Sequence, residues 1–166
     1  MTSIFLFIYL LLSSPPTESH SLKITVDNIK SIEGTIEIGI FNKGDNFLEK
    51  EQAYKGISVE VTSSSETVVV KNLPEGTYAI SLYHDKNGNG AFDRNFLGLP
   101  KEPYGFSNNV KPKFSPPNFT DCCFNLTTNH SITISLINWI IRNKKSLSQI
   151  IKKIPSQNNT LIWKSA

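Results

Sequence analysis

The chain has 166 residues, of which 39% are hydrophobic and 19% charged, which fits one globular domain and excludes a disordered chain or two ordinary domains. Six of the seventeen Lys and Arg residues follow residue 137, where no Asp or Glu lies, so the rest, with eleven basic and fourteen acidic residues, carries a formal charge of −3. Because no basic stripe interleaved with aromatics lies in this mildly acidic part, we expect no nucleic-acid partner.

The N-terminus carries an apolar run from Ile4 to Leu12, followed by Ser13-Ser-Pro-Pro16. A run of this length is typical of the core of a signal peptide and is short for a bilayer span. We therefore predict a signal peptide over residues 1–21, with Ser19 or Ser21 last before cleavage, and an exported protein that is periplasmic, cell-surface or secreted. Because no Lys or Arg precedes Ile4, a buried first strand is the alternative.

Seven short segments between residues 22 and 137 alternate apolar with polar residues, which is typical of half-buried strands. Turn-forming residues separate them, and no helical period lies between them. We therefore predict an all-β fold over residues 22–137, an antiparallel β-sandwich of about seven strands that is immunoglobulin-like or prealbumin-like. The alternating apolar residues are Leu22, Ile24, Val26, Ile36, Ile38, Ile40, Ile57, Val59, Val61, Val68, Val70, Tyr78, Ile80, Leu82, Phe124, Leu126, Ile132, Ile134 and Leu136.

Two connections between these strands are long, one from Asn42 to Lys55 and the other from Asp85 to Asp121. Neither shows a helix or strand pattern. Long unstructured loops are uncommon in compact domains unless they are functional or are ordered by something else, such as a bound ion. We expect the function of the protein in the second connection.

The second connection opens with Asp85-Lys-Asn-Gly-Asn-Gly-Ala-Phe-Asp93. Counted from its first residue, positions 1, 3, 5 and 9 carry side-chain oxygens, position 6 is glycine and position 7 offers a carbonyl, as in the first half of a calcium-binding loop. Position 12 departs from the pattern because Phe96 replaces the bidentate Glu, so Glu102, or an acid of the other connection such as Asp45 or Glu49, has to complete the ligand set. We predict calcium as a cofactor, bound by Asp85, Asn87, Asn89, the carbonyl of Ala91, Asp93 and Glu102.

A metal-free turn is the alternative, because Asn-Gly-Asn-Gly suits left-handed turns that Asp and Asn side chains cap on their own. In the calcium interpretation Asp85 is a ligand more than a packing group, so Asp85→Ala should leave the calcium-free protein about as stable as its parent. The neighbouring His84 ends the alternating face of a strand, and we interpret it as a hydrogen-bonded residue at the edge of the core rather than as a catalyst.

Four segments of the chain form a longer motif whose order is kept. They are His84-Asp-Lys-Asn-Gly-Asn-Gly90 with Asp93, Asn95-Phe-Leu-Gly-Leu-Pro-Lys-Glu-Pro-Tyr-Gly-Phe-Ser-Asn108, Asn72-Leu-Pro-Glu-Gly-Thr-Tyr78 and Pro116-Pro-Asn-Phe-Thr-Asp121. With this motif the chain resembles the domain of unknown function family 2141, a group of exported bacterial proteins, over roughly Leu22 to Ile137. The resemblance implies an exported β-sandwich, and it brings neither a known activity nor established site residues.

After Ile137 the chain becomes basic, and Ile140, Leu147, Ile151 and Ile154 fit one face of a C-terminal amphipathic helix with lysines elsewhere. A basic tail over residues 138–166 suits peripheral contact with an anionic membrane surface. The alternatives are a weakly ordered tail and a helix packed on the sandwich.

These features predict a non-catalytic exported module whose long loops, ordered by calcium, present aromatic side chains to an extracellular or periplasmic ligand or protein. If the aromatics tuck under the loops as a satellite core instead, the binding interpretation weakens. The aromatic residues concerned are Tyr104, Phe106, Phe114 and Phe119.

Two other functions remain open at this point. One is a hydrolase that uses His84 with Asp85 or Asp93 and a nucleophile such as Ser107, although no nucleophile elbow, metal-protease helix or phosphate loop is present. The other is a structural protein attached to a surface by the basic tail.

Overall fold

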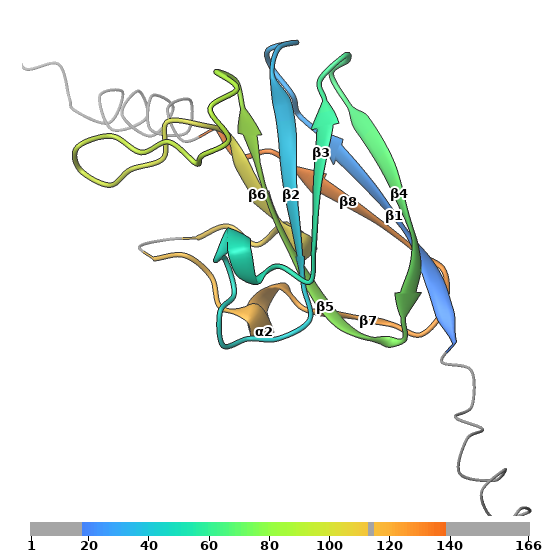
Figure 1. The fold of residues 1–166 in the computed structure, drawn as a ribbon. Helices are drawn as coiled ribbons and strands as arrows, with labels where there is room; N and C mark the ends of the chain where they lie inside the picture. The colour runs from blue at the N-terminus through green and yellow to red at the C-terminus, as the bar shows by residue number, and fades with distance from the viewer. Residues whose placement is uncertain (1–17, 113–114, 139–166) are drawn as a thin grey trace, which may run out of the picture.

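A computed structural model describes residues 18–112 and 115–138, and these residues form a two-layer β-sandwich (Figure 1). The strands are β1 (Ser19–Asp27), β2 (Thr35–Phe41), β3 (Lys55–Glu60), β4 (Glu66–Pro74), β5 (Gly76–Asp85), β6 (Tyr104–Phe106), β7 (Phe124–Leu126) and β8 (His130–Ser135). Three short helices accompany them, η1 (Lys50–Gln52), η2 (Ser107–Asn109) and α2 (Phe119–Cys122). The apolar N-terminal run, Phe114 and the predicted C-terminal helix lie outside the described residues.

One layer is a three-stranded sheet in the order β4-β1-β8, and the other is a sheet in the order β3-β2-β5-β6, in which β7 also pairs with β5. The pairs are antiparallel except β1 and β8, which run parallel. This exception arises because β8 returns to the first strand from the other layer, without the hairpin that antiparallel neighbours use. The predicted all-β sandwich is confirmed, with one parallel pair.

The core lies between the two sheets and is built by the alternating residues. Successive side chains of a strand point to opposite faces, so every second residue faces the other sheet. On β2 these residues are Ile36, Ile38 and Ile40, each at most 3% exposed. They pack against equally buried residues of β1, β5 and β8, namely Leu22, Ile24, Val26, Ile80, Leu82 and Ile134.

The long connections contain elements that the sequence pattern did not predict. η1 lies in the first connection, and β6, η2 and α2 lie in the second, so the expectation that neither holds a helix or strand is wrong. β6 escaped detection because all three of its residues are buried, which leaves no alternation to read. Its middle residue, Gly105, packs against β8, where a Cβ atom would lie 2.7 Å from Cγ2 of Ile134.

The first strand begins slightly earlier than the predicted Leu22. β1 starts at Ser19, which pairs with Pro74, and His20 pairs with Leu73. At the other end of the described residues, Ile137 and Tyr104 exchange two backbone hydrogen bonds of 2.7 and 3.2 Å. Within residues 18–112 and 115–138, no helix has the length and apolar character needed to cross a membrane.

Candidate functional site

The outer face of the five-stranded sheet, which points away from the three-stranded sheet, is hollow in its middle. Strand register places Gly39 of β2 between Gly56 of β3 and Ser81 of β5. Ser58 lies beside Glu37 in the next outward-facing row. The small residues Gly39, Gly56, Ser58 and Ser81 form the floor in the middle of this face.

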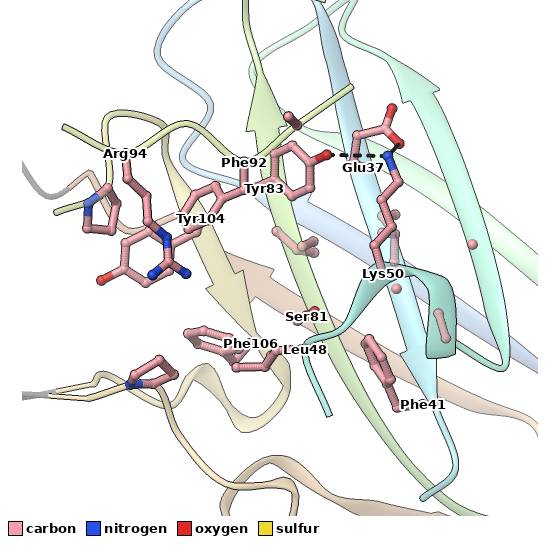
Figure 2. Close-up of a pocket in the computed structure, with 18 of the residues that line it drawn as sticks. Glu37, Phe41, Leu48, Lys50, Ser81, Tyr83, Phe92, Arg94, Tyr104 and Phe106 are labelled. Atoms are coloured by element: carbon pink, nitrogen blue, oxygen red, sulfur yellow. Dashed lines mark hydrogen bonds and ion pairs between the residues drawn. The ribbon is translucent and has the colours of Figure 1, made fainter. Parts of the chain in front are cut away.

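The two long connections close over this face and leave a groove with a volume of about 730 Å³ (Figure 2). Leu48 and Lys50 line it from the first connection, and Phe92, Arg94 and Leu99 line it from the second. The groove therefore joins the region in which the sequence predicted function to a sheet face that the sequence reasoning did not single out.

A continuous run of aromatic rings forms one wall of the groove. Ring centroids are 5.4 Å apart between Tyr83 and Phe92, 5.9 Å between Phe92 and Tyr104, and 5.7 Å between Tyr104 and Phe106. The last two pairs are edge-to-face, an arrangement that adds about 0.5–1.5 kcal/mol for each pair beyond the burial of its area. The guanidinium of Arg94 lies 5.4 Å from the centre of the Phe92 ring.

These aromatics are not displayed on loops as predicted. Tyr104 and Phe106 are 6% and 8% exposed, and half-buried Phe119 packs edge-on against Phe47 with ring centroids 5.8 Å apart. They form a satellite core with Ala79 beneath the long connections, which was the alternative that the sequence left open. Of these residues, Tyr104 and Phe106 line the groove.

A polar cluster closes one end of the groove, where Figure 2 shows Tyr83, Lys50 and Glu37 side by side. Nζ of Lys50 donates to the carbonyl of Gly90 (2.8 Å) and lies 3.6 Å from Oε2 of Glu37. The Tyr83 hydroxyl donates to the same carbonyl (3.0 Å). The first connection and the Asp85 loop (residues 85–93) are thereby tied together at the rim.

Tyr83 and Lys50 of this cluster keep their usual ionisation states at neutral pH. Burial raises the pKa of the Tyr83 phenol, and this effect outweighs the opposing influence of Lys50. Partial burial disfavours the charged form of Lys50, but the neighbouring Tyr83 and Glu37 more than offset it and raise the pKa of the ammonium group. At neutral pH the groove thus offers a phenol and a cation.

Asp85 organises the Asp85 loop from a buried position. The side chain is 2% exposed. One carboxylate oxygen accepts the N–H groups of Gly88 (2.8 Å) and Asn89 (3.2 Å), and the other accepts that of Gly90 (2.7 Å). Both glycines have positive φ values, 67° and 73°, so the turn that brings these N–H groups inward requires residues without a Cβ.

The other predicted ligands of the loop converge on Asp93. The amide nitrogens of Asn87 and Asn89 donate to its two carboxylate oxygens over 3.0 and 3.3 Å. The amide oxygens accept backbone N–H groups, Asn87 from Asn89 (3.2 Å) and Asn89 from Ala91 (2.9 Å). Ala91 thus joins this network through its N–H group.

Among the acids considered for the last ligand, Glu102 is the one that reaches the loop. The side chain is 6% exposed, and its oxygens accept the N–H groups of Lys86 (3.2 Å) and Asp93 (3.1 Å). Within the described residues, no hydrogen bond or ion pair connects Asp45 or Glu49 to the loop. The structure therefore brings Asp85, Asn87, Asn89, Asp93 and Glu102 into one network.

This donor set fits a calcium ion chemically. Calcium prefers carboxylate, amide and carbonyl oxygens, and the network contains three carboxylates and two amides. A carboxylate has about four lone-pair positions, so an oxygen that accepts a backbone N–H can still bind a cation. The same hydrogen bonds also close the turn without a metal, and the metal-free alternative is therefore open as well.

Of the residues considered for a hydrolase, His84, Asp85 and Ser107 each bond to different backbone groups. Fully buried His84 places Nε2 2.7 Å from the Glu33 carbonyl, and Asp85 serves its own loop. The buried Ser107 hydroxyl accepts the Ile80 N–H (2.9 Å) and donates to the Cys122 carbonyl (2.6 Å). His84 thus occupies the structural position that its place in the alternation predicted, and Ser107 holds β5 against the end of α2.

The two cysteines are both free. Cys122 is fully buried, and this burial, with smaller contributions from Asp121 and Cys123, raises the pKa of its thiol to about 12. Because a cysteine attacks as its thiolate, Cys122 is not a nucleophile at neutral pH.

Together, the sandwich, the closed long connections and the groove define a small β-sandwich protein with a ligand-sized hollow on one sheet. The family model described as an uncharacterized protein conserved in bacteria, domain of unknown function family 2141, matches residues 24–135. The chain belongs to this family, and the resemblance inferred from the sequence is confirmed. Comparisons with curated proteins and with solved structures give no significant match.

Proposed function

We propose that the protein is an exported, non-catalytic binding module that holds an elongated and mainly apolar small molecule in the groove. The observation that carries this proposal is the groove of about 730 Å³ on the outer face of the five-stranded sheet. Its volume lies within the range of roughly 300–1,000 Å³ that small-molecule sites occupy, and such sites are mostly apolar with a few placed polar groups. The aromatic wall and the polar cluster at one end match this description.

The shape of the groove supports a ligand rather than incomplete packing. Side chains in protein interiors interdigitate closely and leave few voids larger than a water molecule. At Gly56, in contrast, an added Cβ would meet no atom within 4 Å. The space above Gly56 is thus open, whereas the space above Gly39 is taken by the Phe41 ring, from which an added Cβ would be 2.8 Å away.

The lining favours a ligand with flat apolar faces and a polar group at one end. The rings of Phe92 and Tyr104 offer surfaces for stacking, which is favourable for aromatic groups and for the apolar faces of other ring systems. Lys50 and Glu37 at the end of the groove offer a cation and a carboxylate. A ligand with one hydroxyl, carboxyl or amide group meets a partner there.

A fluorescent probe of apolar sites, 1-anilinonaphthalene-8-sulfonate, tests the groove directly. We expect saturable binding to the full chain, and loss of that binding in Gly56→Leu, whose side chain would fill the space above β3. Gly56→Ala is the matched control and should bind as the parent does. If Gly56→Leu binds the probe like the parent while melting at the same temperature, the groove is not the site.

Calcium is part of the proposal because the Asp85 loop forms the rim of the groove. Asp85, Asn87, Asn89, Asp93 and Glu102 would hold the ion, and its charge would fix a loop whose Gly90 carbonyl accepts hydrogen bonds from Lys50 and Tyr83. Calcium binding would therefore stabilise the shape of the groove, and it takes part in no reaction. Among residues 18–112 and 115–138, no hydrogen bond joins His84 to Asp93 or Ser107, so no contact there supports the hydrolase.

Export and attachment by the basic tail belong to the same proposal. The pairing of Ser19 and His20 with β4 favours an exported chain that begins at or before Glu18, earlier than the cleavage point that the sequence suggested. Intact-mass measurement of exported protein decides this, and retention of Met1 through Leu12 would contradict export by cleavage. Cell fractionation with and without residues 138–166 tests membrane contact by the tail.

A further inference from the structure

Glu18, His20 and Glu75 lie together where β1 begins and β4 turns into β5. Each offers one ligand atom, a carboxylate oxygen or a ring nitrogen, and the three atoms lie within 4.8 Å of one another. Strand pairing brings them together, because His20 is opposite Leu73 and the Glu75 N–H donates to the Glu18 carbonyl over 3.2 Å. Their backbone positions are therefore fixed by the sheet.

The imidazole of His20 lacks a partner for one of its nitrogens. Nε2 is shielded from solvent and, within the described residues, has no hydrogen-bond partner. Most buried polar atoms are hydrogen-bonded, and leaving one unpaired costs about 1–3 kcal/mol. The two carboxylates beside the ring make no ion pair with it in the part of the chain that the structure describes, although an imidazolium would attract them.

The same three groups form a suitable ligand set for a metal ion. Zinc binds His nitrogens and carboxylate oxygens at about 2.0–2.2 Å, which places tetrahedral ligands roughly 3.4 Å from one another. Rotation of the long Glu side chains reaches this spacing from the present separation. Two carboxylates and a neutral imidazole also balance the charge of a divalent cation.

We propose that Glu18, His20 and Glu75 form a binding site for a divalent transition-metal ion of the zinc type. One nitrogen and two oxygens would come from the protein, and water would occupy the remaining positions. The imidazole distinguishes this site from the Asp85 loop, whose all-oxygen set suits a hard cation such as calcium. The bound ion would clamp the start of β1 to the turn between β4 and β5.

The two metal sites lie at opposite ends of one strand and are independent. Glu75 precedes the first residue of β5, and Asp85 is its last. A strand rises about 3.4 Å per residue, so the sites are roughly 30 Å apart. The zinc-type site does not depend on the proposed groove function, and its failure would leave that function untouched.

Zinc titration of the exported chain by calorimetry, at neutral pH in a non-chelating buffer, tests the proposal. We expect one saturable zinc site and an increase in melting temperature with zinc, because a ligand that binds only the folded state stabilises it. Calcium and magnesium should not compete for this site. His20→Ala and Glu75→Gln should each weaken zinc binding at least roughly tenfold, since even loss of a partner behind a metal ligand costs about that much.

Two control variants and one further ligand variant show whether zinc binds at this site. His130→Ala removes an exposed imidazole elsewhere, which stacks on Phe124, and Asp93→Asn alters the Asp85 loop, so both should bind zinc like the parent. Glu18→Gln changes an exposed side chain and should weaken zinc binding without unfolding the protein. Equal zinc affinity in the parent and His20→Ala, or an exported chain that begins after His20, would overturn the proposal.

Discussion

The two faces of the five-stranded sheet use the same strands for different purposes. On β5 the inward residues Ile80 and Leu82 meet the other sheet and are almost fully buried, whereas the outward residues Ser81 and Tyr83 line the groove. The inner face forms the main core with the other sheet, and the outer face combines a floor of small residues with an aromatic wall. The comparison teaches that the main core lies on one face of this sheet, whereas the other face carries the satellite core and the groove.

The largest expected loss of stability comes from a substitution on the inner face, and a neighbouring substitution on the outer face serves as its comparison. Ile80→Ala should lower the free energy of unfolding by about 2–5 kcal/mol, because it removes buried methyl groups and leaves a cavity. Ser81→Ala, one residue away, should change it by less than about 0.5 kcal/mol. Urea unfolding of both variants measures the difference, and equal losses would show that the outer face is part of the stabilising core.

The next effect concerns the rim of the groove and replaces an expectation drawn from the sequence. If Asp85 served only as a calcium ligand, its loss would not change the stability of the calcium-free protein. Its carboxylate instead accepts three backbone N–H groups from a buried position. Asp85→Ala should therefore cost about 1–3 kcal/mol even in chelator, since buried donors lose their acceptor.

Urea unfolding in the presence of chelator is the measurement. Asn87→Ala, at an exposed position of the same loop, is the control and should cost less. If Asp85→Ala unfolds like its parent in chelator, the carboxylate does not hold the loop, and the original ligand-only interpretation returns.

Much of the inner face could be predicted from the sequence. Seven of the eight strands alternate apolar and polar residues because one face of each is buried, and this period of two is visible in the chain itself. β6 has three buried residues and no period, and Gly105 is present because Ile134 of a distant strand lies against it. Such a contact depends on the finished fold and cannot be read locally.

The candidate sites divide in the same way. The Asp85 loop was recognised because its residues are close in sequence, and Glu102 was included because a shell with an acid missing requires one nearby. The groove was missed because its floor combines Gly39, Gly56 and Ser81 from three strands. The sequence of β5 did indicate that Tyr83, which stands between the core positions Leu82 and His84, faces outward. Only the strand register shows that it lies beside Glu37.

A smaller change in stability is expected from calcium, which would bind the Asp85 loop at the rim of the groove and leave the inner face unchanged. With an incomplete ligand set we expect a Kd on the order of 10⁻⁴ M. At roughly 1 mM calcium this stabilises the fold by about 1.4 kcal/mol, which raises the melting temperature by several degrees. Asp93→Asn should remove most of this shift, because it takes a charge from the ligand set and keeps a side chain that can accept the amides of Asn87 or Asn89.

Melting curves in calcium, magnesium and chelator measure the shift. Glu51→Gln, an exposed carboxylate of the first connection, is the matched control and should respond to calcium like the parent. A parent protein that melts at one temperature in all three conditions would identify the loop as a metal-free turn.

The smallest effect is expected at the tip of the second connection, where Phe96 is 94% exposed. Because this ring buries almost nothing, Phe96→Ala should change the free energy of unfolding by less than about 0.5 kcal/mol. Phe92 lies four residues earlier and packs against Tyr83 and Tyr104 in the groove wall, so Phe92→Ala should cost clearly more and should also weaken binding of 1-anilinonaphthalene-8-sulfonate. Urea unfolding and probe titration of the two variants separate a ring that builds the groove from one outside it. A loss of probe binding in Phe96→Ala equal to that in Phe92→Ala would mean that the loop tip folds over the groove when a ligand is present.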